Sequence, residues 1–397
     1  MLPKILPSSS NNKKTVSVLG STGTIGKNTV DVIKENREFY DVIALTANNN
    51  VDLLVQQAKL LRPKYVVIAN EDLSFKLEKE LEHYDIKTLS GKQALLEVSN
   101  IKCDVYICAI VGISAFEPLM KAIKARSNIG IANKECLVAA GDIIKREVKA
   151  NNVSIIPIDS EHNAIFQTLD LDNKDNISDI ILTASGGPFR DLAVEEMKNM
   201  RPEQAIKHPN FIMGKKISVD SATMMNKGLE MIEAYHLFNL KQNQIQAIIH
   251  REQIIHGIVN YKDGTALAMM NIPDMRVPIS YTLNYPKRIP ISHTKLSLTE
   301  IGRLSFEEID HKKFPAVNIC MEALKEGGNM PCVLSVANEV AVQNFLEGNI
   351  GFLEIISIVY DVMNKITECD LNTIGDVLNC DSETRKITYE IIKKYKK

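Results

Sequence analysis

Residues 15–26 read TVSVLGSTGTIG, a short apolar run that leads directly into three glycines spaced three residues apart. The run Thr15–Leu19 predicts a buried strand, and the apolar spacing that follows predicts a helix over Gly26–Asn36. Glycines at such a turn let the backbone approach a pyrophosphate, which then lies at the helix N-terminus. The spacing differs from the commoner G-x-G-x-x-G, and a glycine turn can also be a plain chain reversal. Its place in a first strand–turn–helix unit favours a dinucleotide site.

The alternation of apolar runs and amphipathic segments continues to about residue 160. Further strands are predicted at Val42–Thr46, Tyr65–Ala69, Val105–Ile110, Ser127–Ala132 and Val153–Ile158, with helices at Val51–Leu61, Phe116–Ala125 and Gly141–Ala150. Continuous apolar strands separated by helices are typical of a parallel, doubly wound sheet, because its strands are covered on both faces. We therefore expect a Rossmann-like nucleotide-binding domain over residues 15–158, after a flexible extension at residues 1–14.

The pattern changes after about residue 180. A strand at Ile180–Ala184 precedes a Gly-rich turn, and a helix is predicted at Met224–Phe238. The alternating segments Gln253–Tyr261 and Ala266–Ile272 flank Asp263-Gly264, which is a strong hairpin signal. His256 in the first of these segments is expected to be a core histidine whose polar atoms are satisfied.

The remaining residues predict a linker and a helical domain. Pro286 and Pro290 indicate a linker over residues 286–311, and residues 312–397 show helical spacing, clearest in Val333–Leu346, Phe352–Ile366 and Ser382–Lys396. The predicted fold class is α/β, with an N-terminal Rossmann-like parallel sheet, a central α+β catalytic domain over residues 159–285 and a C-terminal α-helical domain.

Composition excludes several classes of function. The 397 residues include 47 basic and 49 acidic ones, a formal net charge of −2, so no overall field recruits nucleic acid or a membrane surface. No apolar stretch approaches the ~20 residues that span a bilayer. The seven cysteines are scattered and contain no CxxC, which argues against a disulfide framework and a thiolate zinc site. We expect a cytoplasmic enzyme.

The end of the second strand bears on the choice of cofactor. An NAD enzyme usually carries Asp or Glu about 20 residues past the glycines, where it binds the ribose hydroxyl. This chain has Asn48, Asn49 and Asn50 there. Because a carboxylate would repel a 2′-phosphate, its absence favours NADP. No Arg or Lys is present either, so the three Asn side chains would have to donate the hydrogen bonds.

Two carboxylates follow the strand Val153–Ile158, in the sequence Asp159-Ser160-Glu161-His162. This is the carboxyl edge of the predicted sheet, where ligands bind in open α/β folds. Oxygen donors without thiolates suit Mg²⁺ or Mn²⁺. Taken alone, the same residues rather favour a helix N-cap, with Glu161 stabilised by the helix dipole.

A second polar group lies in the central domain. Ser185-Gly186-Gly187 offers a hydroxyl and backbone N–H groups that suit an anion. Residues 219–230 contain a hydroxyl, an amide, an ammonium and a carboxylate, and Glu230 is expected at the edge of the helix face formed by Met225, Leu229, Ile232 and His236. The loop 208–214 carries apolar residues beside polar donors, as in a lid that excludes water, or is an ordinary exposed loop.

Together these strings resemble the 1-deoxy-D-xylulose 5-phosphate reductoisomerase family. The matching blocks are GSTGTIG at 20–26, ANKE at 132–135, DSEHNAIFQ at 159–167, SGGPFR at 185–190, HPN at 208–210, MGKKISVDSATMMNKGLE at 213–230, PDMR at 273–276 and ANE at 337–339. The resemblance covers nearly the whole chain past residue 14, and the run 215–230 is highly specific.

The resemblance implies a reaction and its cofactors. The family converts 1-deoxy-D-xylulose 5-phosphate to 2-C-methyl-D-erythritol 4-phosphate, a step toward isoprenoid precursors, with NADPH and one divalent cation. The cation is Mg²⁺ or Mn²⁺, with Co²⁺ as a further alternative. We also expect a homodimer that uses the hairpin region, and no nucleic-acid or membrane partner.

Carried over position by position, the resemblance implies three sets of site residues. The metal ligands are Asp159, Glu161 and Glu230, which with Lys134 are also the catalytic residues. The substrate-binding residues are Lys134, Ser160, Glu161, Ser185, His208, Ser221, Asn226, Lys227 and Glu230. The cofactor-binding residues are Thr22, Gly23, Thr24, Ile25, Asn133, Glu135 and Gly214, to which we add Asn48, Asn49 and Asn50.

Two positions depart from the family pattern. Asn48 and Asn49 stand where members often carry a glycine and a basic residue, which weakens the preference for NADP. Phe211 stands where the lid commonly has Trp, and it keeps an apolar cover but loses an N–H donor. Two alternatives remain: an NADP-dependent dehydrogenase of another phosphorylated substrate, and a nucleotide-sensing protein without enzymatic activity.

Overall fold

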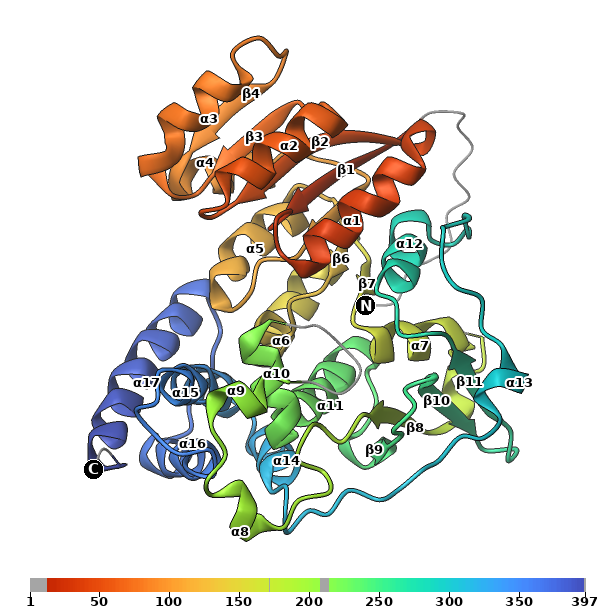
Figure 1. Cartoon of the computed structure of the whole chain (residues 1–397), viewed down its shortest axis with the longest axis vertical. Coiled ribbons are helices and arrows are strands. Elements are labelled where there is room, and N and C mark those ends of the chain that lie inside the picture. Colours follow the sequence, from red (N-terminus) through yellow and green to blue (C-terminus); the bar gives the residue numbers. More distant parts are fainter. Residues whose placement is uncertain (1–12, 171, 208–213, 396–397) are drawn as a thin grey trace. The chain divides into compact units, whose positions relative to one another are not determined.

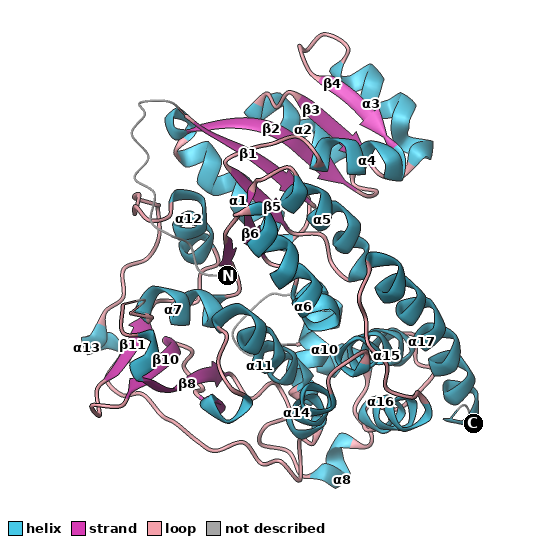
Figure 2. Cartoon of the chain, turned by 180° about the vertical axis from the view of Figure 1, so that it is seen from behind, coloured by secondary structure: helices cyan, strands magenta, loops and turns pink. Residues whose placement is uncertain are grey.

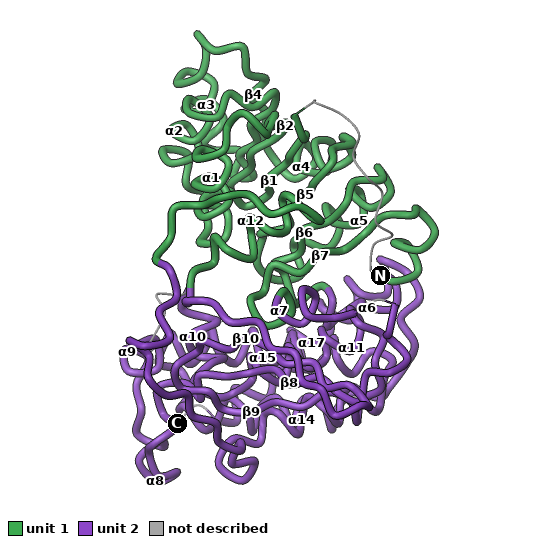
Figure 3. Tube along the Cα trace, turned by 90° about the vertical axis from the view of Figure 1, so that its right-hand side faces the viewer, with its two compact units in different colours: residues 1–136, 144–163, 274–294 green, residues 137–143, 164–273, 295–397 purple. Residues whose placement is uncertain are grey.

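The structure is a computed structural model (Figure 1) that describes residues 13–170, 172–207 and 214–395. The predicted extension at residues 1–14 therefore lies almost wholly outside the described residues. The chain divides into two compact units, coloured separately in Figure 3. Unit 1 comprises residues 1–136, 144–163 and 274–294, and unit 2 comprises residues 137–143, 164–273 and 295–397. The three-domain division made from the sequence has other bounds and stays a prediction.

Unit 1 is built on a seven-stranded sheet of order β4-β3-β2-β1-β5-β6-β7 whose neighbouring strands all run parallel. The strands are β1 (Lys14–Leu19), β2 (Tyr40–Ala47), β3 (Tyr65–Ile68), β4 (Lys87–Ser90), β5 (Val105–Cys108), β6 (Asn128–Ile131) and β7 (Ile155–Pro157). The strand order reverses between β1 and β5, which is the point where open α/β sheets bind ligands. The six strands predicted in this region are confirmed. β4 was not predicted.

Helices connect these strands: α1 (Thr24–Glu35), α2 (Val51–Leu61), α3 (Ser74–Leu81), α4 (Gly91–Ser99), α5 (Phe116–Lys124) and α6 (Lys134–Asn151), the last shared by both units. α12 (Arg276–Asn284) also belongs to unit 1. Its Ile279 and Leu283 are buried in the same apolar cluster as Val16 and Ile107 of the sheet. The side chain of Asn284 in addition donates to the hydroxyl of Tyr40. These contacts explain why a late segment returns to the first unit.

Unit 2 contains a four-stranded mixed sheet of order β11-β10-β8-β9. Its strands are β8 (Ile177–Ala184), β9 (Ile245–Ile249), β10 (Ile255–Tyr261) and β11 (Ala266–Met270). β8 pairs parallel with β9 and antiparallel with β10, and β10 and β11 form the predicted hairpin. Gly264 in its turn has φ 88°, a backbone conformation that glycine adopts readily. His256 is buried with Nε2 3.2 Å from the carbonyl oxygen of Asn271, as expected for a core histidine.

In unit 2, α11 (Met225–Phe238) packs against β8 and β9 of this sheet, and further helices continue to the C-terminus (Figure 2). The helices of this unit are α8 (Val194–Met197), α9 (Pro202–Ala205), α10 (Lys215–Thr223), α11, α13 (Leu298–Ile301), α14 (Ala316–Glu326), α15 (Met330–Leu346), α16 (Glu354–Lys365) and α17 (Ile374–Tyr395), while α7 (Ser160–Thr168) has residues in both units. α15 packs against α10, α14, α16 and α17 and is buried along nearly its whole length. Among the described helices, none is long and apolar enough to cross a membrane.

Candidate functional site

The predicted nucleotide turn joins β1 to α1. Gly20 has φ 81°, and a Cβ on Gly26 would lie 2.2 Å from the carbonyl oxygen of Gly20, so the turn and the helix are in backbone contact. Gly23 occupies the N-cap position of α1, and no side chain caps this helix. Its first N–H groups therefore stay available to an anion. Of the residues predicted to bind the cofactor here, Gly23 and Thr24 are exposed, whereas Thr22 and Ile25 are half-buried.

Asn48, Asn49 and Asn50 follow β2 and are all exposed. The side-chain oxygen of Asn50 accepts a hydrogen bond of 3.2 Å from the N–H of Leu53 and so caps α2. The side-chain oxygen of Asn49 accepts one of 3.0 Å from Asn70. Capping by Asn50 was not predicted from the sequence, although Asn before an apolar-periodic segment is the usual signal for a helix N-cap.

Asn133 lies between β6 and α6 and makes three hydrogen bonds. Its amide nitrogen donates to the carbonyl oxygens of Ile110, at 2.7 Å, and Gly112, at 2.8 Å, and its side-chain oxygen accepts from the N–H of Cys136 at 2.7 Å. Asn133 therefore caps α6 and also holds the loop after β5. Glu135 in the same helix is buried.

Lys134 and Asp159 meet at the carboxyl ends of two neighbouring strands, β6 and β7. Lys134 Nζ lies 2.7 Å from Asp159 Oδ2, with 7% and 16% of the two side chains exposed. Burial alone would raise the pKa of Asp159, but the Lys134 ammonium, together with His162, holds that pKa well below its usual range. The carboxylate is therefore ionised and suited to binding a cation.

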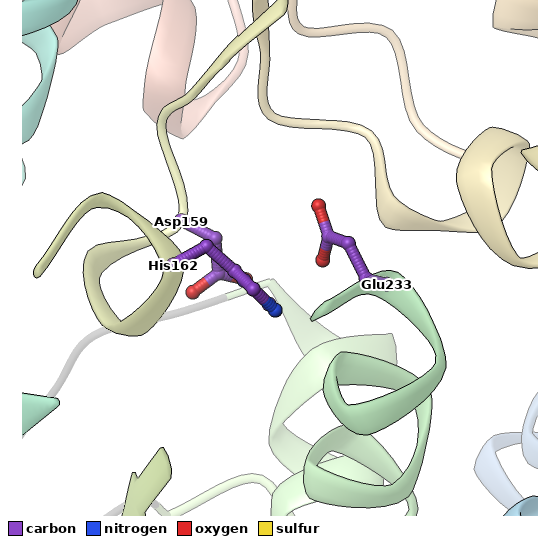
Figure 4. A group of neighbouring side chains, drawn as sticks. All are labelled: Asp159, His162 and Glu233. Atoms are coloured by element: carbon purple, nitrogen blue, oxygen red, sulfur yellow. The ribbon is translucent and has the colours of Figure 1, made fainter. Parts of the chain in front are cut away.

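Asp159 directly precedes α7, and the N–H of Asn163 donates to its carbonyl oxygen at 2.8 Å. Asp159 thus occupies the N-cap position of α7, as one interpretation predicted. Its carboxylate also lies near other carboxylates, as the interpretation as a metal ligand requires. Ser160 Oγ donates to Glu161 Oε2 at 2.6 Å, and Glu161 is only 9% exposed. Figure 4 shows the side chains of Asp159 and His162 at the start of α7 and that of Glu233 on α11.

In unit 2, the turn that contains Ser185 packs directly on the segment that contains Ser221. A Cβ on Gly187 would lie 2.4 Å from the carbonyl oxygen of Ser221. Gly186 and Gly187 have φ values of 80° and 71°, which L residues rarely adopt. Arg190 donates to the carbonyl oxygen of Ser185 at 2.7 Å and so supports this turn. Arg190 ends the block SGGPFR at 185–190, and no role was predicted for it from the sequence.

Asn226, Lys227 and Glu230 lie on the first turns of α11. Both the Asn226 amide and the Lys227 ammonium donate to the carboxylate of Glu230, and Lys227 and Glu230 are 3% and 1% exposed. α11 starts after Met224, whose φ of 62° turns the chain sharply between α10 and α11. Two residues predicted to bind phosphate and one predicted to bind metal thus form one hydrogen-bonded group, in which Lys227 and Glu230 are buried and Asn226 is half-buried.

The remaining predicted residues are Gly214 and His208. Gly214 is exposed at the N-cap position of α10. His208 lies outside the described residues, as does Phe211 of the predicted lid.

Three family models match the chain in succession. The model described as 1-deoxy-D-xylulose 5-phosphate reductoisomerase matches residues 16–141, that of its C-terminal domain matches residues 155–238, and the model described as DXP reductoisomerase C-terminal domain matches residues 270–387. The chain belongs to the 1-deoxy-D-xylulose 5-phosphate reductoisomerase family. The family and the enzyme class predicted from the sequence are confirmed.

Known relatives are similar over nearly the whole chain. A 1-deoxy-D-xylulose 5-phosphate reductoisomerase from Wolbachia sp. subsp. Drosophila simulans (strain wRi) is 47% identical over 96% of this chain and 98% of its own. The structure of the Zymomonas mobilis reductoisomerase in complex with NADPH has a TM-score of 0.92 at 41% identity, covering 96% of this chain and 99% of that one. A reductoisomerase bound to NADPH, fosmidomycin and magnesium has a TM-score of 0.90 at 36% identity, covering 96% and 98%. The predicted α/β fold class is confirmed.

Proposed function

We propose that this chain catalyses the reaction of its family, the rearrangement of 1-deoxy-D-xylulose 5-phosphate and its reduction by NADPH to 2-C-methyl-D-erythritol 4-phosphate. The observation that carries this proposal is a complete set of chemical groups within a chain that is 47% identical to a reductoisomerase. The chain has a glycine turn that suits a dinucleotide and buried carboxylates that suit a cation. It also has hydroxyl and ammonium donors that suit a phosphate.

The carboxylates fit a hard divalent cation. Asp159, Glu161 and Glu230 each offer an oxygen ligand and are largely buried, and carboxylate oxygens are the donors that Mg²⁺ and Mn²⁺ prefer. Magnesium is present together with fosmidomycin in two related reductoisomerase structures. We assign these three residues as the metal ligands. A bound cation would supply Lewis acidity to the carbonyl and hydroxyl oxygens of the substrate while its carbon skeleton rearranges.

The side chains around the reacting carbons have separate tasks. Lys134 keeps Asp159 ionised and offers an N–H donor toward substrate oxygens. Ser160 orients Glu161 through its hydroxyl. Bound NADPH would supply the hydride, and Thr22 to Ile25 would bind its pyrophosphate at the N-terminus of α1. Asn133, which fixes the start of α6, would contact the same cofactor together with Glu135 and Gly214.

The phosphate of the substrate is assigned to unit 2. Ser185, Ser221, Asn226 and Lys227 would bind it, with His208 as a further donor. Binding a phosphate away from the reacting carbons orients those carbons and converts binding energy into rate. Lys227 and Asn226 currently donate to Glu230 and would redistribute their hydrogen bonds when a phosphate enters.

The test is NADPH oxidation, followed by absorbance, with purified protein, 1-deoxy-D-xylulose 5-phosphate and Mg²⁺ or Mn²⁺. We expect turnover that stops with a chelator, prefers NADPH to NADH and falls at least a hundredfold in Glu230→Gln. Metal-independent turnover in Glu230→Gln would favour the dehydrogenase alternative. Tight NADPH binding without turnover under any metal would favour the nucleotide-sensing alternative.

We also propose a cytoplasmic homodimer. β11 is an edge strand of the described sheet, and Ala266, Leu267 and Ala268 on it are exposed, with Leu267 at 43%. An exposed apolar edge strand favours pairing with another chain, here a second copy. Leu267→Lys should shift the protein toward monomer in analytical ultracentrifugation, and a wild-type monomer at every concentration would reject the dimer.

All seven cysteines are free thiols, which suits a reducing compartment.

A further inference from the structure

Asp220 is a buried carboxylate directly before Ser221, and only 1% of it is exposed. Its Oδ2 lies 2.7 Å from Nζ of Lys216, one turn earlier in α10. Its Oδ1 accepts a hydrogen bond of 2.8 Å from the amide nitrogen of Asn338. A buried carboxylate is costly unless it is paired and hydrogen-bonded. Lys216 belongs to α10 itself, so it neutralises Asp220 within the helix, whereas Asn338 belongs to α15 and restricts where α10 can lie.

Asn338 connects α10 to the C-terminal helices. It lies in the middle of α15, is fully buried and is 118 residues from Asp220 in sequence. α15 packs against three other helices of the C-terminal region, so the position of Asn338 within it is fixed by this packing. α10 has nine residues, and a helix this short is not stable alone in water. Its position must come from contacts such as this hydrogen bond and the buried Val219 and Ala222.

The position of α10 determines the position of Ser221, which lies in its last turn. The carbonyl oxygen of Ser221 is in close contact with Gly187, where a Cβ would lie at 2.4 Å. α10 also leads, through Met224, into the turn of α11 that carries Asn226 and Lys227. A displacement of α10 would therefore move Ser221 relative to both neighbouring parts of the proposed phosphate site.

We infer that Asp220 and Asn338 are positioning residues for the substrate phosphate. Together they hold α10 at the place where the Ser221 hydroxyl can donate to a phosphate oxygen. Asn338 acts through Asp220 and Ser221 and does not itself contact the substrate. This inference rests on the proposed assignment of Ser221 to phosphate binding.

The test compares Asn338→Ala with Asn344→Ala, a matched control in the same helix. Asn344 is also buried, but its amide nitrogen donates to the carbonyl oxygen of Val340 in the same helix, and its side-chain oxygen accepts from Asn349. For Asn338→Ala we expect KM for the sugar phosphate to rise about tenfold and kcat to change less than threefold, with a parallel rise in the Kd of inorganic phosphate. For Asn344→Ala we expect KM and this Kd within twofold of wild type. Equal KM values in the two variants would overturn the inference.

Two further variants separate failure of the inference from failure of the site. If Ser221→Ala leaves the Kd of inorganic phosphate unchanged, the proposed phosphate site is wrong. If Ser221→Ala raises this Kd and Asn338→Ala does not, only the positioning role is wrong. When Asn338→Ala is added to Ser221→Ala, we expect no further rise in KM, because Asn338 acts through Ser221. Should Asn338→Ala fail to fold, Asp220→Ala removes the oxygen that accepts from the Asn338 amide and must raise KM at least threefold.

Discussion

The buried pair of Lys227 and Glu230 gives the sharpest prediction on the site. With 3% and 1% of their side chains exposed, the two charges have little access to water. Lys227→Met keeps the size of the side chain but removes the ammonium that donates to the carboxylate of Glu230, while the Asn226 amide still donates to it. Removing one partner of a buried ion pair costs about 3–5 kcal/mol. Since Asn226 still donates to Glu230, we expect the free energy of unfolding to fall by about 3 kcal/mol.

The assay is urea unfolding followed by circular dichroism in the presence of a chelator. The control is the double variant Lys227→Met/Glu230→Gln, in which the uncompensated charge is absent. Replacing both members of a buried pair is often close to neutral, so the double variant should regain most of the lost stability. Added Mn²⁺ should stabilise the single variant more than the wild type, because the cation no longer competes with Lys227 for Glu230. A single variant within 1 kcal/mol of wild type, or a double variant less stable than the single one, would refute this reasoning.

Three other changes test other parts of the site and the fold. Gly187→Ala places a Cβ 2.4 Å from the carbonyl oxygen of Ser221, so steady-state kinetics should show at least a tenfold higher KM for the sugar phosphate. An unchanged KM would mean that this contact does not shape the phosphate site. Asn49→Asp puts a carboxylate at the end of β2, so KM for NADPH should rise about tenfold and KM for NADH should change less, whereas equal changes would argue against a 2′-phosphate there. Burial raises the pKa of Tyr40 to about 12, so its neutral form adds stability that is complete below pH 10 and is lost as pH rises toward 12. Denaturant titrations at several pH values should show that Tyr40→Phe removes about 2–3 kcal/mol of this pH dependence of the free energy of unfolding. The same pH dependence in wild type and variant would contradict this prediction.

The sequence predicted those parts of the fold that have a strong local pattern. The strands of unit 1 with continuous apolar runs, the β10–β11 hairpin and the helices α11 and α15 were all predicted. β4 reads Lys-Thr-Leu-Ser and lies at the edge of the sheet with its side chains at least partly exposed, so it has no apolar run to detect. α12 was missed because its buried face is decided by distant partners, such as Tyr40, which lies 244 residues from Asn284.

The same distinction applies to the site. The pair of Lys134 and Asp159 follows from two neighbouring parallel strands, because their carboxyl ends lie at one edge of the sheet. The pair of Lys227 and Glu230 has the i,i+3 spacing of facing helical side chains and could have been predicted from the sequence. The hydrogen bond between Asn338 and Asp220 could not, because no local periodicity connects two helices 118 residues apart.

The central claim is that Asp159, Glu161 and Glu230 bind one catalytic divalent cation. Mn²⁺ binding to the purified protein, followed by electron paramagnetic resonance, tests it most directly. We predict one tightly bound Mn²⁺ per chain when the substrate is present, at least tenfold weaker binding in Glu230→Gln, and unchanged binding in Glu347→Gln, a control at an exposed position. Equal Mn²⁺ affinity in the wild type and Glu230→Gln would contradict the account.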